Sequence, residues 1–256
     1  MVDHATGYRE RRSTALPATV WKRWCEPGPS IVRPDGCIDL IWDGSRVLVA
    51  GPDTVARRHE TTAPVTLTAI RLAPGVAPTV TGLPAVELRD RQPTLTDVLG
   101  ADASRWEESV AGSTTPGAML ESLAAEALRR RDGVPDWIGP TVAAIRAGDR
   151  FDDVADRLGL SARQLRRRCD DAFGYGPKTL HRILRVEDAS RSLREGFSLT
   201  DTAHRHGYSD YSHMFREFRA MVGSTPSDVT GPTPRHASVA QRSTGLPSGS
   251  STTAYR

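Results

Sequence analysis

Residues 158–168 read LGLSARQLRRR, and residues 206–218 read HGYSDYSHMFREF. In each stretch a glycine is followed by a serine and then by residues with the spacing of an amphipathic helix, so Ser161 and Ser209 are the expected helix caps. A short helix, a glycine turn and a capped helix with a polar outer face form the plan of a helix-turn-helix that reads DNA. Since the pattern occurs twice, we predict one chain that reads two places on a duplex.

We name residues 161–173 the first reader helix and residues 209–222 the second reader helix. At 100° per residue each has an apolar and a polar side. The apolar sides hold Leu165, Cys169, Ala172 and Phe173 in the first helix and Tyr211, Met214, Phe215, Phe218, Met221 and Val222 in the second. The polar sides carry the candidate DNA-binding residues Arg163, Arg166, Arg167, Ser212, His213 and Arg216. Arginine can bind a guanine edge or a phosphate with two N–H groups, and serine and histidine can donate or accept at base edges.

A predicted helix over residues 177–195 connects the two readers and ends at Gly196. About 19 residues at 1.5 Å rise span roughly 28 Å. With the flanking turns, this length approaches the ~34 Å between successive major grooves on one face of B-DNA. An arginine-rich helix face is by itself often only a solvated surface. The two units, their polarity and the connector together favour DNA binding.

The composition alone does not identify the function. The net charge is +3, and residues 151–230 hold 13 Lys and Arg against 12 Asp and Glu, so only the clustering of arginines over residues 163–168 points to nucleic acid. Cys25, Cys37 and Cys169 lie far apart and match no zinc or disulfide pattern, so we expect no metal and no cofactor. The sequence has no recognisable signal peptide or membrane span, which predicts a cytoplasmic protein without a membrane partner.

The chain divides into two predicted domains and a tail. Residues 31–90 have mostly the pattern of strands, including a hairpin turned by Asp43-Gly44-Ser45 and a strand over residues 65–72. From residue 94 to 131 the pattern is helical. The predicted parts are an α+β domain, mostly β and then helical, over residues 1–133, an all-α domain over residues 134–230, and a disordered tail over residues 231–256.

Residues 137–229 resemble the DNA-binding domain of the AraC/XylS family of bacterial transcription regulators. The most specific match is GYSDYSHMFREFR at residues 207–219, and residues 161–168 fit the first unit. The resemblance implies two helix-turn-helix subdomains joined by a linker helix, with the six polar side chains above in successive major grooves. It also implies operator DNA and RNA polymerase as partners. Cys169 and Thr202 depart from the residues usual at those core positions, which puts the quality of packing in doubt.

The N-terminal half has a weaker resemblance. Residues 33–42, RPDGCIDLIW, resemble an uncharacterised domain often found before AraC-type domains. That context implies the sensing of a small-molecule effector, or dimerisation into a homodimer. Asp35, Cys37, Asp39 and His59 suggest a catalytic or metal site, but Asp35-Gly36 is more simply a turn, and a nucleophilic Cys37 would need a nearby base. We therefore favour a structural role for these residues, and the role of Cys37 stays open.

The sequence as a whole predicts a one-component transcription regulator that is not an enzyme. The alternative is an enzyme with DNA-directed chemistry, such as an alkyl-transfer repair protein fused to this kind of reader. Such proteins place a reactive cysteine beside metal-binding cysteines, which Cys25 and Cys37 do not resemble. The effector, the operator, the regulated genes, the sign of regulation and the oligomeric state are not determined by the sequence.

Overall fold

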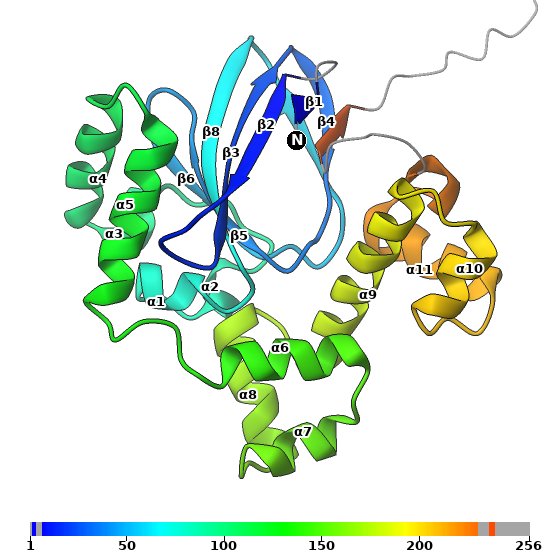
Figure 1. The fold of residues 1–256 in the computed structure, drawn as a ribbon. Coiled ribbons are helices and arrows are strands. Elements are labelled where there is room, and N and C mark those ends of the chain that lie inside the picture. The colour runs from blue at the N-terminus through cyan, green and yellow to red at the C-terminus, as the bar shows by residue number, and fades with distance from the viewer. Residues whose placement is uncertain (1, 4–6, 230–235, 239–256) are drawn as a thin grey trace, which may run out of the picture.

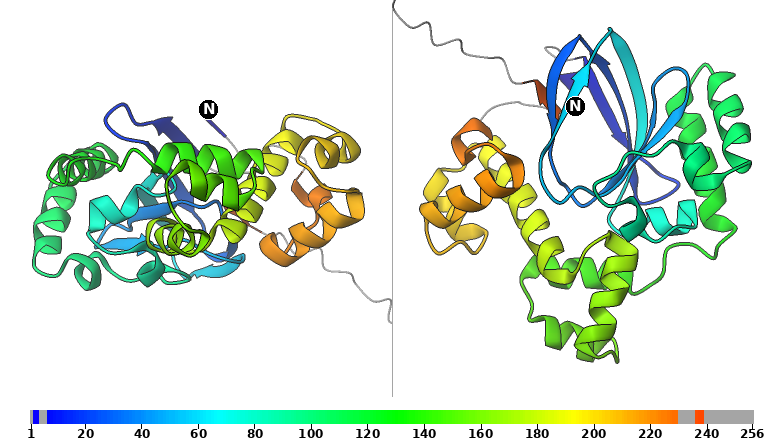
Figure 2. Two further views of the ribbon diagram at one scale, coloured as in Figure 1. Left: turned by 90° about the horizontal axis from the view of Figure 1, so that it is seen from below. Right: turned by 180° about the vertical axis from the view of Figure 1, so that it is seen from behind.

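The computed structural model describes residues 2–3, 7–229 and 236–238. Its N-terminal part is built on a sheet whose one side is covered by helices, and its C-terminal helices form two groups joined by a long helix (Figure 1). Views from below and from behind show the same separation of the two helical groups (Figure 2). Among the described residues, no helix has the length and apolar character needed to span a bilayer.

Two antiparallel sheets form the β part of the chain. The larger has the order β1 (Val2–Asp3), β2 (Tyr8–Arg12), β3 (Ala18–Cys25), β8 (Val65–Leu72), β5 (Ile38–Trp42) and β6 (Val47–Ala50). The smaller has the order β7 (Arg57–Thr61), β4 (Gly28–Val32) and β9 (His236–Ser238). The register places Trp21 of β3 and Ile41 of β5 on either side of Ala69 in β8, so these three side chains share one face of the larger sheet.

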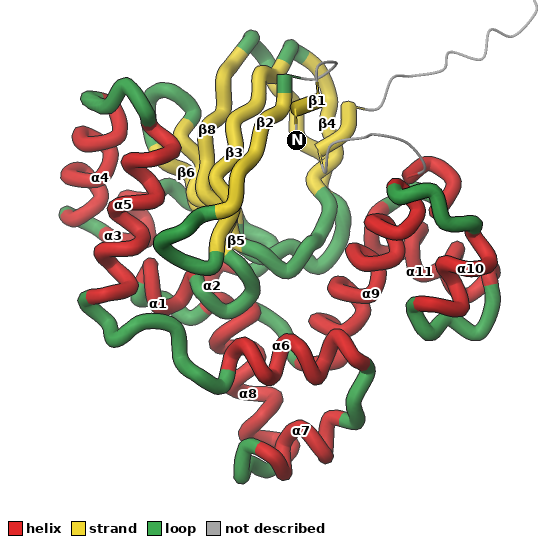
Figure 3. The backbone as a smooth tube through the Cα atoms, viewed as in Figure 1, coloured by secondary structure: helices red, strands yellow, loops and turns green. Residues whose placement is uncertain are grey.

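The opposite face of the larger sheet packs against helices. Leu40, Ile70 and Leu72 are fully buried there, in one apolar core with residues of the covering helices. These helices are α1 (Ala77–Thr81), α2 (Ala85–Leu88), α3 (Leu95–Leu99), α4 (Asp102–Ala111) and α5 (Pro116–Arg129). In Figure 3 the yellow strands gather in the N-terminal part of the tube, and all of the described helices follow residue 76.

The C-terminal part is helical throughout its described residues up to Val229. It comprises α6 (Ile138–Ala147), α7 (Phe151–Arg157), α8 (Ala162–Phe173), α9 (Pro177–Arg194), α10 (Leu199–Arg205), α11 (Tyr211–Val222) and a 3₁₀ turn over Pro226–Val229. Leu165 and Phe173 of α8, Leu180 of α9 and Phe218 of α11 belong to a second, separate apolar core. Val134 packs against both cores. The boundary near residue 134 stays a prediction.

The predicted fold class is confirmed, since a mostly β region precedes an all-helical one. The hairpin of β5 and β6 and the strand over residues 65–72 are confirmed as well. Two features go beyond the sequence interpretation: strands β2 and β3 precede residue 31, and the helices α1 and α2 lie at residues 77–88, inside the region predicted to be mostly strands. Within the predicted disordered tail, residues 236–238 pair with β4, because an open strand edge can accept any backbone; the rest of the tail lies outside the described residues.

The contacts between the two parts of the chain include two hydrogen bonds. At the C-terminal end of α8, Arg89 donates from Nη1 to the carbonyl oxygen of Gly174 at 3.2 Å. Gly174 has a φ of +84°, and a Cβ there would lie 2.5 Å from the ring of Pro52, so only glycine allows this close approach. At the C-terminal end of α11, the backbone N–H of Ala56 donates to the carbonyl of Met221 at 2.7 Å.

Candidate nucleic-acid interface

The first reader helix is α8, and its start is fixed by the predicted cap. Ser161 Oγ accepts from the backbone N–H of Gln164 at 3.3 Å, while Gln164 Oε1 accepts from the N–H of Ser161 at 2.8 Å. This capping box satisfies two N–H groups that the helix cannot pair itself. The preceding turn has Gly159 at φ +62°. The helix therefore begins at a defined residue behind a tight turn.

The faces of α8 are as predicted. Leu165, Cys169, Ala172 and Phe173 are buried. Arg163, Arg166 and Arg167 are exposed, and 78% of the Arg166 side chain is accessible although Asp170 lies 3.9 Å away. The neighbouring Arg168 is placed differently, because its guanidinium lies over the ring of Trp137, 5.8 Å from its centre. Since the far end of α8 packs on the N-terminal part, its arginine-bearing first turns project outward.

The second reader helix is α11, and its predicted serine cap was wrong. The helix begins at Tyr211, so the cap is Asp210, whose carboxylate accepts from the backbone N–H of His213 at 2.7 Å. Ser209 instead donates its hydroxyl to Asp210. Tyr211 was expected on the buried side and is 38% exposed. A carboxylate at this position suits the positive end of the helix dipole.

The three predicted reader side chains of α11 differ in their surroundings. Ser212 and Arg216 are exposed. His213 is half-buried: its ring lies edge-on to Tyr208 with 5.3 Å between centres, and its Nδ1 is 3.3 Å from the hydroxyl of Ser209. Five of the six candidate side chains therefore face solvent, and His213 is held against its own subdomain. Contact of all six with DNA stays a prediction.

Glu217 fixes the second reader helix to α9. Its side chain is only 4% exposed and accepts from Arg182 Nε at 3.2 Å and from Arg185. Arg185 also lies over the ring of Tyr208, 4.4 Å from its centre. A buried carboxylate held by two arginines resists sliding of one helix along the other. The α9 helix has 18 residues, which corresponds to about 27 Å, and the helices α8 and α11 lie near its opposite ends (Figure 1).

A basic groove between α9 and α11 was missed by the sequence interpretation. It is lined by Lys178, His181 and Arg182 of α9 together with His213 and Arg216 of the second reader helix. The groove therefore opens beside the polar side of α11. Its α9 members recur at spacings of three and four, opposite the apolar seam of that helix, and this periodicity is the signal that could have identified them.

The same C-terminal region matches known proteins. Residues 154–231 match a family described as a helix-turn-helix domain. Over 80 residues the chain is 36% identical to the HTH-type transcriptional activator RhaS of Escherichia coli, a stretch of 31% of this chain and 29% of RhaS. Both matches fall in the region that resembles the AraC/XylS family in sequence. The match to RhaS therefore lies in the helix-turn-helix region and spans less than a third of the relative's length.

The N-terminal part of the chain matches a different family. Residues 18–94 match a family described as a domain of unknown function, DUF6597, in agreement with the predicted uncharacterised N-terminal domain. Among solved structures, ToxT from Vibrio cholerae O395 aligns with 90% of this chain and 100% of its own, at 9% identity and a TM-score of 0.43. A likeness of that size carries no conclusion about function.

The two departures from the usual residues of the C-terminal domain lie in its core. Cys169 and Thr202 are both fully buried. Burial raises the pKa of the Cys169 thiol to about 12 and also raises the pKa of the Cys25 thiol. Since the thiolate is the reactive form, neither cysteine suits nucleophilic chemistry. In the part of the chain that the structure describes, no group of three or more His, Cys, Asp or Glu could hold a metal ion.

Proposed function

We propose that the whole chain is a one-component transcription regulator that binds operator DNA with α8 and α11 in successive major grooves. Arg163, Arg166 and Arg167 act at one groove, and Ser212, His213 and Arg216 act at the next. The N-terminal domain senses a small-molecule effector and changes how the two helices are presented. The protein works in the cytoplasm, where its operator is accessible, and performs no catalysis.

One observation carries the proposal. Two capped helices present exposed polar side chains at opposite ends of α9, and the buried sides of both belong to one apolar core that includes residues of α9. A stiff connector of about 27 Å with flanking turns suits the spacing of major grooves on one face of a duplex. A solvated surface alone would not require the same arrangement twice.

Selection from random duplexes followed by binding assays tests the proposal. The full chain should enrich sequences with two conserved blocks about one helical turn apart. Replacing Arg167 or Arg216 with Ala should weaken binding to the selected duplex by about 1–3 kcal/mol each if they contact guanine, with less effect on random DNA. Recovery of unrelated sequences without enrichment would contradict the proposal and would instead support a non-selective architectural protein.

Further partners are part of the same proposal. The regulator meets RNA polymerase at the promoter and assembles as a homodimer, and co-purification with polymerase and sedimentation of the full chain test these points. The rival alkyl-transfer function is tested with an alkylated duplex: transfer of the alkyl group to Cys25, Cys37 or Cys169, detected by mass spectrometry, would favour the enzyme.

A further inference from the structure

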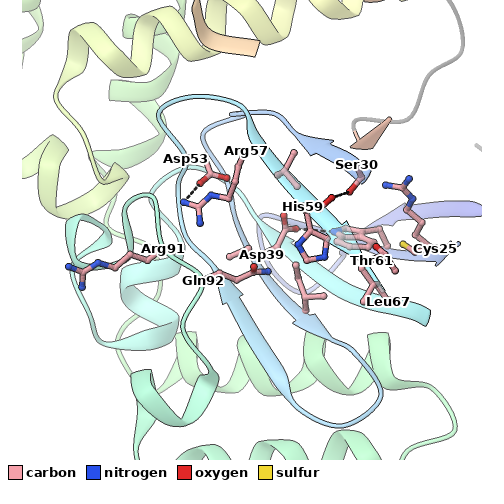
Figure 4. A pocket seen from close by; sticks show the side chains of 15 residues that line it. Cys25, Ser30, Asp39, Asp53, Arg57, His59, Thr61, Leu67, Arg91 and Gln92 are labelled. Carbon is pink, nitrogen blue, oxygen red and sulfur yellow. Dashed lines mark hydrogen bonds and ion pairs between the residues drawn. The ribbon is translucent and has the colours of Figure 1, made fainter. Parts of the chain in front are cut away.

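A cavity of about 80 Å³ lies between the two sheets of the N-terminal domain. Trp21, Arg23 and Cys25 line it from β3, where they occupy alternate positions and share one face. The smaller sheet supplies the opposite wall with side chains that include Ser30 and His59, and Figure 4 shows these facing the same space as Asp39. The larger sheet therefore packs on helices with one face and borders this cavity with the other.

The cavity is lined by more arginines than carboxylates. Asp39 accepts from Trp21 Nε1 at 2.9 Å and lies 3.3 Å from Arg71 Nε. Asp53 lies 3.1 Å from Arg57, as the dashed line in Figure 4 marks. Both carboxylates of the lining thus have arginine partners.

Arg23 is the cation left over in this lining. Arg23 is only 8% exposed. Its guanidinium Nε has no hydrogen-bond partner among the described residues. Figure 4 shows Arg91, another lining residue, directed away from the remaining side chains. A buried cation without a counter-ion is unfavourable, and an anion placed beside it would relieve the cost.

We propose that this cavity binds a compact organic carboxylate, with its carboxylate on Arg23 and its apolar body between the sheets. The proposal rests on the regulator function above and names the class of its effector. Trp21, Ile41, Leu67 and Val32 supply apolar surface around the polar group, the usual composition of a small-molecule site. The volume of about 80 Å³ suits a compact ligand.

The cavity also adjoins a contact with the second reader helix. Asp53 and Arg57 line the cavity and form an ion pair with each other, and Ala56 lies between them in the sequence. The N–H of Ala56 is the donor to Met221 at the end of α11. A ligand that displaces the Asp53–Arg57 pair therefore moves the segment that holds α11. Occupancy of the cavity is transmitted to the DNA-binding domain along this short path.

Isothermal titration of the full chain without DNA tests the site. The probes are cyclohexanecarboxylate and pentanoate, their neutral amides, and inorganic phosphate. We expect the carboxylates to bind at least tenfold more tightly than the amides, and Arg23→Met to remove that preference. Lys22→Met, on the exposed face of the same strand, should leave it unchanged. Arg23→Met should melt no lower than the wild type, because it removes a buried charge.

Each outcome decides the proposal. Equal binding of acids and amides, binding of phosphate alone, no binding of either carboxylate, or a loss of folding in Arg23→Met would overturn it. A change in affinity for the selected duplex on adding the carboxylate, absent in Arg23→Met, would support the transmission step. Carboxylate binding without any DNA binding would leave the site standing and would refute the regulator function instead.

Discussion

Removing the Glu217 carboxylate should loosen the second reader helix. Breaking a buried ion pair by deleting one partner costs about 3–5 kcal/mol. Here Glu217 is 4% exposed and Arg185 is 15% exposed, but Arg182 is 42% exposed and can return to water. Since only one of the two arginines loses a buried counter-ion, we expect Glu217→Ala to lower the free energy of unfolding by about 3 kcal/mol. Glu217→Gln keeps the shape and should cost less.

Urea unfolding followed by circular dichroism measures this difference. Glu126→Ala is the matched control, because Glu126 also pairs with two arginines, Arg129 and Arg130, but on an exposed helix face. That change should cost much less than Glu217→Ala, because water screens an exposed ion pair. Glu217→Ala should also weaken binding to the selected duplex, while Glu126→Ala should not. Equal losses of stability in the two variants would refute the reasoning from burial.

Three further changes test other parts of the structure. Ser161→Ala should destabilise by about 1 kcal/mol, the usual value of a helix cap, whereas Ser209→Ala should have little effect; equal urea midpoints would disprove the assignment of the caps. Gly174→Ala should lower the free energy of unfolding by about 2 kcal/mol or more, because the strain of a left-handed backbone adds to the clash of the new Cβ with Pro52. Gly159→Ala is the control, since its backbone is also left-handed but no atom lies near the new Cβ. Burial raises the pKa of Asp53 from 3.8 to about 6. The folded state therefore binds this proton more tightly than the unfolded chain, and the contribution of the protonated carboxyl to the free energy of unfolding should be lost as the pH rises from 3.8 through 6. Unfolding of wild type and Asp53→Asn between pH 4 and 7 checks this, and a constant difference would contradict it.

The parts of the fold that depend on local pattern could be predicted from the sequence. The faces of α8, the box of Ser161 with Gln164 and the hairpin of β5 and β6 follow from helical periodicity, capping chemistry and turn residues. The second reader helix was also found, but its cap was assigned one residue early. Ser209 and Asp210 are both good caps, and only the position where the helix begins distinguishes them.

The parts that depend on distant contacts could not be predicted. The pairing of β3 with β8 and of β9 with β4 joins residues far apart in the chain. The ion pairs of Glu217 with Arg182 and Arg185 depend on how α9 and α11 pack. A glutamate among other polar residues of a helix gives no sign in the sequence that it is buried. Arg23 likewise has the sequence setting of a surface residue, and only the second sheet encloses it.

Footprinting of the selected duplex tests most directly whether two helices read two grooves. With wild-type protein, methylation protection should cover guanines in two major-groove segments about 10 base pairs apart. The double variant Arg166→Ala/Arg167→Ala should lose protection in one segment, and Ser212→Ala/Arg216→Ala should lose it in the other. Unchanged protection in both variants, or a single protected segment, would contradict the account.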